Sequence, residues 1–234
     1  MSDGQRVPTA VLRRGILSLA VFFVILGVAL FLPAGDIRWG KGWLFILVFF
    51  VLTVPSAIYL WRTNPEIFVA RSRIFRAGTK RWDKVLMAFL FFSLTAIFIV
   101  AGFDAGRFHW SSVPPWLTVL GYVLLSICFF LSVWAESVNK FAEPSVRIQT
   151  DRGHKVIDTG PYAIVRHPMY LSGLFLCAGI PLTLGSFWAL IPGAVTTIVL
   201  VVRTILEDRT LQRELEGYKA YAARVPHRLI PGIW

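Results

Sequence analysis

The chain has 234 residues, of which 56% are hydrophobic and 16% are charged, and its mean hydropathy is +0.65. Soluble domains carry about 25% charged residues, so this composition excludes a disordered chain and argues against a soluble enzyme. The net charge is +11, from 24 basic and 13 acidic side chains. In a soluble protein that excess indicates nucleic-acid binding, but here the basic residues must first be placed relative to a bilayer.

Four uncharged stretches are long enough to cross a membrane as helices. A hydrocarbon core of about 30 Å needs about 20 apolar residues, because backbone groups must be satisfied within the segment. The four predicted spans are Ile16–Leu32, Gly42–Trp61, Val85–Phe103 and Trp116–Ala135. The expected fold is therefore all-α: a polytopic membrane protein with four full transmembrane helices.

The loop after the second span has helical signals of its own. Asn64-Pro65-Glu66 fits a helix start, with a capping Asn, a Pro at the first helical position and an acid in the first turn. Apolar residues then alternate with arginines, which predicts a basic interfacial helix at about 64–77. The alternating residues are Ile67, Phe68, Ile74 and Phe75 with Arg71, Arg73 and Arg76. Anchoring to anionic lipid is the favoured role of this helix, and substrate capture is the alternative.

A fifth uncharged stretch, Met169–Val202, would extend about 51 Å as a single helix, well beyond a membrane core. It contains Gly179-Ile180-Pro181, Gly185-Ser186 and Pro192-Gly193, which are helix-breaking combinations. We therefore expect a helical hairpin over 169–202 that turns near Leu184–Ser186 and has two short or tilted arms. A C-terminal amphipathic helix should follow, because apolar residues recur at helical spacing and would dock it on the protein. These are Leu211, Leu215, Tyr218 and Ala222.

The distribution of basic residues predicts the orientation. If the N-terminus is cytoplasmic, the cytoplasmic segments 1–15, 62–84, 136–168 and 203–234 hold 21 of the 24 lysines and arginines. This is the positive-inside pattern. The N-terminus, the polar segments that flank the hairpin and the C-terminus are all expected on the cytoplasmic side.

Metal and disulfide chemistry find no support in the sequence. The two cysteines, Cys128 and Cys177, both lie inside apolar stretches, where cysteine behaves as a small buried hydrophobe. No pair of cysteines or histidines has the spacing of a zinc site, and no Gly-x-Gly-x-x-Gly follows a strand pattern. We expect neither a metal nor nucleic acid among the partners.

Three motifs around the hairpin carry a family resemblance. They are Gly160-Pro-Tyr-x-x-x-Arg166-His-Pro-x-Tyr170, then Arg203-x-x-x-Glu207 followed by an acid, then Gly217-Tyr-x-x-Tyr221. In order and spacing they resemble the isoprenylcysteine carboxyl methyltransferase family of integral-membrane, S-adenosylmethionine-dependent enzymes. The resemblance divides the chain into transmembrane helices over 1–140 and a cofactor-binding and catalytic region over 141–234. The first region resembles the family only in its apolar spans.

The resemblance implies a role for each matching residue. The methyl donor would be held by Gln149, His154, Lys155, Val156, Ile157, Tyr162, His167, Pro168, Met169, Tyr170 and Glu207. Arg203 matches an arginine associated with the substrate, and Arg203, His167 and Glu207 are the candidate catalytic residues. Two positions depart from the pattern: Asp208 stands where a glutamate is usual, and Gln149 aligns only across a small difference in length.

The chemistry of these side chains agrees with such roles. Glu207 can pair with the cofactor's ammonium or its ribose hydroxyls, and Arg203 offers a planar fork to an anionic acceptor. A carboxylate acceptor needs no general base, whereas an amine or thiol must lose a proton, for which His167 or Glu207 is the candidate.

Several alternatives remain open. The favoured acceptor is a prenylcysteine-type or other lipophilic carboxylate, and the others are a phospholipid headgroup amine and a small thiol. A non-catalytic membrane protein would bind no cofactor, and a sterol reductase of related architecture would bind a nicotinamide. In structural terms, Arg203 and Glu207 are also spaced for a simple salt bridge within one helix.

Overall fold

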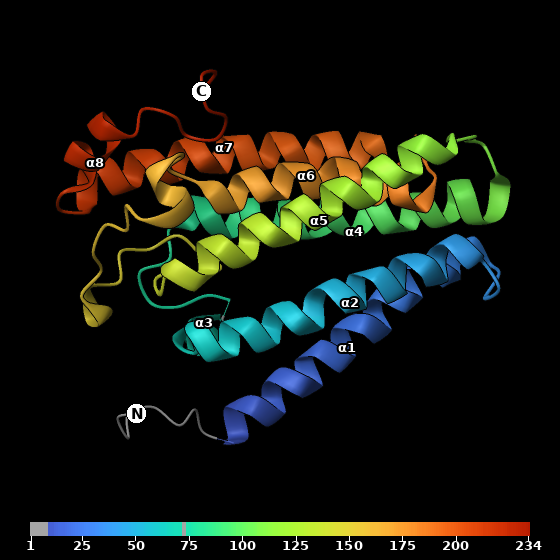
Figure 1. Ribbon diagram of the computed structural model, residues 1–234, viewed down its shortest axis with the longest axis horizontal. Coiled ribbons are helices and arrows are strands. Elements are labelled where there is room, and N and C mark those ends of the chain that lie inside the picture. Colours follow the sequence, from blue (N-terminus) through green and yellow to red (C-terminus); the bar gives the residue numbers. More distant parts are fainter. Residues whose placement is uncertain (1–8, 72–73) are drawn as a thin grey trace.

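The computed structural model describes residues 9–71 and 74–234 as helices joined by turns and loops (Figure 1). The longer helices are α1 (Thr9–Ala34), α2 (Gly40–Thr63), α4 (Arg81–Ala101), α5 (Pro115–Val138), α6 (Pro168–Leu184) and α7 (Leu190–Glu214). The shorter ones are α3 (Glu66–Arg71), α8 (Tyr218–Arg224), the π-helical η1 (Gly102–Phe108) and the 3-10 turns η2 (Thr150–Arg152) and η3 (Gly160–Ala163). No strand occurs among the described residues, so the predicted all-α class is confirmed.

Five helical segments of the described chain are long and apolar enough to span a membrane. They are Gly15–Ala34, Gly40–Thr63, Arg81–Phe108, Pro115–Val138 and Leu190–Glu214. The first four contain the four predicted spans. Their outer faces are apolar, as at Leu17, which is 65% exposed, and Leu32, which is 73% exposed. Side chains of this kind face lipid in a polytopic membrane protein.

The predicted hairpin is present, but one of its arms is longer than expected. α6 ends at Leu184, and Gly185 adopts a left-handed φ of +79° that turns the chain. α7 then runs to Glu214, well past Val202, so this arm is not short. Pro192 lies in the first turn of α7, where no amide is needed, and the charge of Arg203 is neutralised without interrupting the helix.

The interfacial helix is shorter than predicted. α3 covers Glu66–Arg71, and residues 74–80 are not helical. The Arg76 guanidinium donates to the carbonyls of Val69 and Ala70, at 2.6 and 3.3 Å, and so satisfies the C-terminal end of α3. Arg73, which belonged to the predicted basic face, lies outside the described residues.

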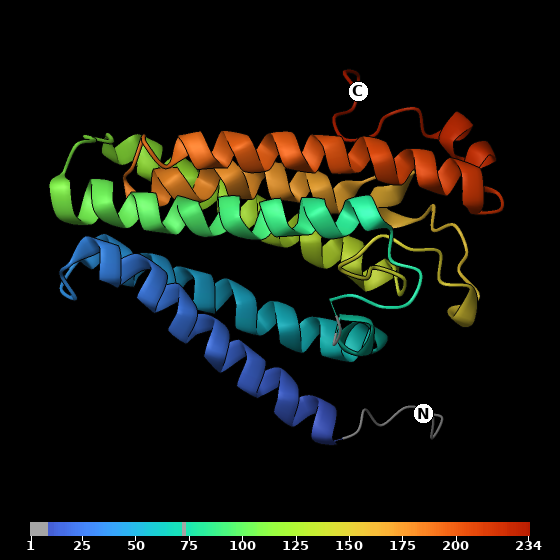
Figure 2. The same cartoon turned by 180° about the vertical axis from the view of Figure 1, so that it is seen from behind.

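Helices α4 to α7 form a bundle, and α1 and α2 form a hairpin along one side of it (Figures 1 and 2). Close packing of α5 on α6 depends on Gly121, because a Cβ there would lie 2.8 Å from the Thr183 nitrogen. Gly193 has the same role between α7 and α6, where a Cβ would lie 2.6 Å from the Cys177 carbonyl. Small residues bring membrane helices together in this way.

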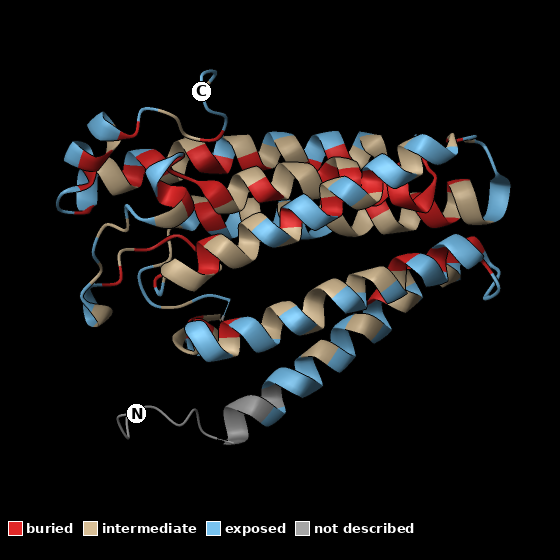
Figure 3. Ribbon diagram, viewed as in Figure 1, coloured by how far each residue is buried: buried red, intermediate tan, exposed pale blue. Residues whose placement is uncertain are grey.

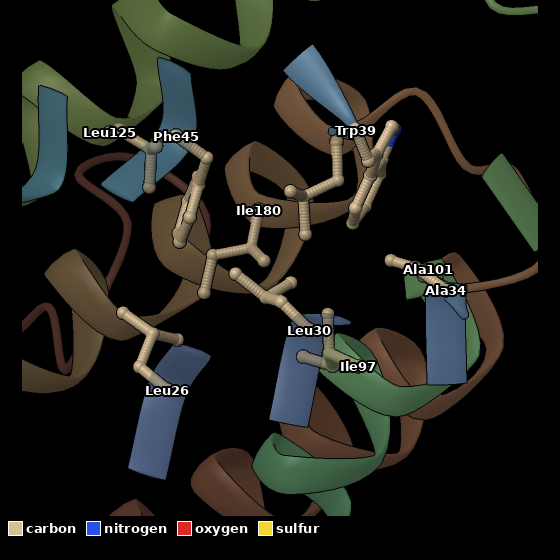
Figure 4. Close-up of a cluster of buried hydrophobic side chains, with 11 residues drawn as sticks. Leu26, Leu30, Ala34, Trp39, Phe45, Ile97, Ala101, Leu125 and Ile180 are labelled. Atoms are coloured by element: carbon tan, nitrogen blue, oxygen red, sulfur yellow. The ribbon is translucent and has the colours of Figure 1, made fainter. Parts of the chain in front are cut away.

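The main apolar core joins the hairpin of α1 and α2 to the bundle of α4 to α7. Figure 4 shows Leu30 of α1 between Ile97 of α4 and Ile180 of α6, with Phe45 of α2 beside Leu125 of α5. In Figure 3 buried residues are frequent in α6 and α7 but sparse in α2 and the described part of α1. The connected end of α1 and α2 packs closely on η1, where a Cβ on Gly106 would lie 2.5 Å from the Ala34 Cβ.

The C-terminal residues dock on the protein as the apolar stripe predicted. Leu215, Tyr218, Tyr221 and Val225 form a buried cluster, and Ile148, Val156, Leu211 and Ala222 pack against it. The stripe does not belong to one helix, because Gly217 has a φ of +78° and separates α7 from α8. We call the end of the bundle where α6 begins and α7 ends the motif end.

Candidate active site

A cavity of about 520 Å³ opens at the motif end between α3, α4, α6, α7 and the loops that follow α5. All twelve residues singled out from the sequence line it. They are Gln149, His154, Lys155, Val156, Ile157, Tyr162, His167, Pro168, Met169, Tyr170, Arg203 and Glu207. The fold thus brings together side chains that are up to 58 positions apart, from Gln149 to Glu207. Their individual roles remain predictions.

Asp208 organises one wall of this cavity, although its side chain is completely buried. Its carboxylate accepts hydrogen bonds from the Arg166 guanidinium, at 2.8 and 3.2 Å, and from Arg228 at 2.9 Å. The Tyr218 hydroxyl donates to it at 3.1 Å and the Gln212 amide at 2.8 Å. Burial, together with the Asp208 charge, raises the pKa of Tyr218, so that this hydroxyl keeps its proton.

His167 is fixed in place by the same carboxylate. Its Nε2 lies 3.3 Å from Asp208 Oδ1 and 3.4 Å from the Tyr218 hydroxyl. Arg166, its neighbour, also donates to the carbonyls of Val225 and Pro226, at 2.8 and 2.9 Å. The Arg-His-Pro element is therefore anchored to α7 and to the C-terminal segment before α6 begins.

Glu207 has a different environment from Asp208, its neighbour in the chain. It is half-buried, it lines the cavity, and it accepts a hydrogen bond from the Tyr170 hydroxyl. Among the described residues, no cation lies within ion-pair distance of its carboxylate. The expected alternative of a salt bridge between Arg203 and Glu207 is therefore not realised. Glu207 is an acidic group with bonding capacity to spare.

Arg203 instead pairs with a residue that the motifs did not indicate. Its Nε lies 2.7 Å from Oδ1 of Asp83, and its Nη2 lies 3.3 Å from Oδ2 of the same carboxylate and 2.5 Å from the Pro144 carbonyl. The guanidinium also lies over the Tyr170 ring, 5.4 Å from its centroid. Asp83 stands in the first turn of α4, 120 residues from Arg203, and is completely buried. In the sequence, the feature that could have pointed to Asp83 is its place as an acidic residue just before the predicted span Val85–Phe103.

The loop between α5 and η3 forms the second wall. The Gln149 amide donates to the Phe141 carbonyl at 2.6 Å and its carbonyl oxygen accepts from Arg152 at 2.8 Å, so both ends of this buried side chain are bonded within the loop. The His154 ring packs against Phe141 at 4.8 Å, and burial lowers its pKa to about 4. His154 is therefore neutral at physiological pH.

Tyr162 closes the cavity next to α5. Its hydroxyl accepts from the Asn139 side chain at 2.9 Å, and its main-chain carbonyl accepts from the Tyr221 hydroxyl at 2.7 Å. Burial raises the pKa of both tyrosines. The Gly217-Tyr-x-x-Tyr221 motif therefore contributes two tyrosines to the cavity lining, and their hydroxyls hold the Asp208 carboxylate and the Tyr162 carbonyl.

Arg71 is a cavity residue from the first half of the chain that sequence reasoning placed only on a surface helix. It reaches from α3, where its Nη1 lies 2.8 Å from Glu136 and its Nε donates to the Ala142 carbonyl at 3.2 Å. Its Nη2 contacts the sulfur of Met169 at 3.9 Å.

The part of the lining that extends along the membrane-spanning helices is mostly apolar. We call this part the apolar arm, and it consists of Met87, Leu90, Phe91 and Leu94 of α4, Gly173, Leu176 and Cys177 of α6, and Thr196 and Leu200 of α7. The α4 residues follow helical spacing along one face. Phe91 is 64% exposed, so the arm borders the lipid-facing surface of α4.

No cluster of three histidine, cysteine or acidic side chains able to hold a metal ion occurs in the described part of the chain.

Comparison with known proteins gives one family match. No curated protein matches the chain. Residues 116–216, from the start of α5 to just beyond α7, match the family model described as phospholipid methyltransferase. This match agrees with the methyltransferase character that the motifs imply. It does not single out isoprenylcysteine carboxyl methyltransferases. It leaves open whether the acceptor is a phospholipid headgroup amine, a prenylcysteine-type carboxylate or a small thiol.

Proposed function

We propose that the protein transfers a methyl group from S-adenosylmethionine to a lipophilic acceptor drawn from the membrane. The observation that carries this proposal is a single cavity with two chemistries. At the motif end the cavity holds the carboxylate of Glu207, which has no cation partner among the described residues. Its apolar arm runs along α4, α6 and α7. A polar, cationic donor and an apolar acceptor can therefore meet in one space.

The residues present fit this cofactor. Glu207 offers its carboxylate to the ribose hydroxyls, which leaves its negative charge for an acceptor amine, and the Tyr162 ring offers a face to the cationic part of the cofactor. His154, neutral at physiological pH, adds no competing positive charge. When bound, the cofactor supplies a methyl group activated by a positively charged sulfur.

The protein's part is to orient the partners and to take up a proton. The acceptor's lone pair forms the new bond to the methyl carbon while the carbon–sulfur bond breaks and its electrons return to sulfur. If the acceptor is an amine, its proton passes to a base, and Glu207 is the available carboxylate. His167 is less available, because Asp208 and Tyr218 already engage its Nε2.

A phospholipid headgroup amine is the acceptor we favour. Two observations support it: the family match over residues 116–216 and the pairing of Arg203 with Asp83, after which no cation of the described residues neutralises Glu207. A prenylcysteine-type carboxylate is the second candidate. The order of the three motifs favours it, as does Arg203 Nη1, for which no acceptor occurs among the described residues.

Cofactor binding is the first test. Calorimetry on the purified protein should give micromolar binding of S-adenosylmethionine and none of a nicotinamide cofactor. Glu207→Gln should weaken binding about 10- to 100-fold, since a hydrogen bond to a charged group contributes about 1.5–3 kcal/mol. Glu214→Gln is the matched control, because Glu214 pairs with Lys80 at 2.7 Å and does not line the cavity. Nicotinamide binding in place of S-adenosylmethionine would support the reductase alternative, and neither would support a non-catalytic protein.

The acceptor is tested separately. Methyl transfer to phosphatidylethanolamine, to a farnesylated cysteine and to a small alkyl thiol should be compared with the same labelled donor. Glu207→Ala should impair cofactor binding more than Arg203→Ala does. If the acceptor is a carboxylate, Arg203→Ala should mainly impair acceptor turnover. An equal loss of cofactor affinity in both variants would contradict this division of roles.

The active site is proposed to face the cytoplasm. Cytosolic S-adenosylmethionine must reach it, and the segments at the motif end belong to those holding 21 of the 24 basic residues. A membrane-impermeant thiol reagent applied to a cysteine introduced at Lys155, which is exposed, should react only in inverted vesicles.

A further inference from the structure

The cavity-lining arginine of α7 is already occupied by a carboxylate of the protein itself. Arg203 lies one helical turn before Glu207, and its guanidinium is held edge-on by both oxygens of Asp83. The second oxygen of Asp83 also accepts from the Val146 amide at 2.7 Å. Only 8% of the Arg203 side chain and none of the Asp83 side chain is exposed. The pair is therefore a finished structural element and not an open anion site.

The other cavity-lining arginines are compensated in the same way. Each has an acidic partner within 2.8 Å: Arg71 with Glu136, Arg147 with Glu143 and Asp151, and Arg166 with Asp208. Lys155, the remaining basic residue of the lining, is exposed. Glu207 is thus the acidic group of the lining that no cation of the described chain neutralises.

This arrangement treats cationic and anionic headgroups differently. An amine that enters the cavity meets Glu207 and completes a charge pair. A carboxylate that sought Arg203 would have to displace Asp83, which would then be left buried without its cation. Breaking a buried ion pair in this way is strongly unfavourable, because the abandoned charge cannot reach water. Repulsion from Glu207 adds to the penalty.

We propose that Asp83 is an internal carboxylate that occupies the Arg203 fork and thereby makes the site select amine-bearing over carboxylate-bearing acceptors. The inference rests on the proposed function, since it names the acceptor class of that site. Asp83 does not touch the acceptor in this scheme. It determines specificity through Arg203 and through the Val146 amide that it also holds.

Binding to the unaltered protein is the first experiment. The protein in lipid nanodiscs is titrated with dodecylamine and with dodecanoate, and its thermal stability is followed by circular dichroism. Dodecylamine should stabilise the protein and dodecanoate should not, and Glu207→Gln should abolish the effect of the amine. Equal stabilisation by both amphiphiles, or stabilisation by dodecanoate alone, would overturn the proposal. No methyl transfer is involved, so this result is separable from failure of the proposed function.

Two variants then test Asp83 itself. Asp83→Ala leaves a carboxylate-sized space beside Arg203, so acetate should raise its melting temperature while leaving the unaltered protein unaffected, with chloride as the ionic-strength control. In Asp83→Asn the preference for amine over carboxylate acceptors should fall about tenfold, because Arg203 gains freedom to bind an anion. The double variant Asp83→Asn with Arg203→Gln should lose that gain.

The outcomes separate specificity from a purely structural role. If Asp83→Ala folds and acetate has no effect on it, or if Asp83→Asn is active with an unchanged preference, the proposal is wrong. If neither variant folds, the comparison of dodecylamine with dodecanoate on the unaltered protein still tests the preference for amines, and equal stabilisation by both overturns the proposal.

Discussion

Replacing Asp208 with asparagine should destabilise the protein far more than the same change at an exposed ion pair. Asp208 is completely buried and receives hydrogen bonds from Arg166, Arg228, Gln212 and Tyr218. Asparagine keeps one acceptor oxygen and turns an NH₂ group toward the other donors, so at least one buried guanidinium contact is lost. Removing one partner of a buried pair costs about 3–5 kcal/mol, because the remaining charge is stranded.

Asp158→Asn is the matched control. Asp158 pairs with Arg224 at 2.7 Å, but the two side chains are 48% and 62% exposed. Such a pair contributes about 0–1 kcal/mol. Unfolding of each variant in mixed micelles, followed by far-ultraviolet circular dichroism, gives the two free energies of unfolding. If Asp208→Asn loses less than about 1 kcal/mol, or no more than the control, Asp208 is not the group that holds this wall together.

Two further predictions concern the apolar arm and the loop. Gly173→Val should raise the acceptor KM about tenfold while the affinity for S-adenosylmethionine stays unchanged. Even a Cβ at this position would lie 2.9 Å from Leu200 Cδ1, so the valine side chain fills the apolar arm. An unchanged acceptor KM would argue against binding of the acceptor in the apolar arm. The folded pKa of His154, about 4, lies below an unfolded value of about 6.5, so the unfolded state takes up the proton first as the pH falls. Stability should therefore decline between about pH 6.5 and 4 by about 1–2 kcal/mol, given partial exposure, and then level off. His154→Asn should remove that decline in melting curves recorded at several pH values, and an unchanged decline would exclude His154 as its source.

The spans and the turn of the hairpin could be read from the sequence because hydropathy and helix-breaking residues are local properties. The ends of α3 and α7 could not. Arg76 satisfies the last carbonyls of α3, and Asp83, 120 residues away, neutralises Arg203 within α7. The contact of Asp83 with Arg203 is tertiary, so no local window of the sequence contains it.

The candidate site divides in the same way. The lining at the motif end was predictable, since the motifs around the hairpin indicated twelve residues that all line one cavity. The partners of those residues were not. The spacing of Arg203 and Glu207 allowed a salt bridge between them, but Arg203 binds Asp83 and Glu207 binds Tyr170. In the sequence Asp208 stands out only as a departure from a motif. Its hydrogen bonds with Arg166, Gln212, Tyr218 and Arg228 show how many groups depend on it.

Arg71 offers a way to separate stability from acceptor binding in the first half of the chain. Its pair with Glu136 is mostly buried, with 34% and 11% of the two side chains exposed. Arg71→Leu strands the Glu136 carboxylate and should cost about 2–4 kcal/mol, somewhat less than a fully buried pair. Adding Glu136→Leu should restore part of that stability, because an apolar pair can replace an ion pair at little cost. A double variant less stable than the single one would contradict this account.

The activity of the same double variant then carries separate information. If Arg71 only ties α3 to α5, methyl transfer should recover together with stability. If its Nη2, whose described contact is the Met169 sulfur, also binds the acceptor's phosphate, the acceptor KM should stay high while cofactor affinity remains normal. Because Arg71 and Met169 both line the cavity, the second outcome would assign part of acceptor recognition to the half of the chain in which no motif was found.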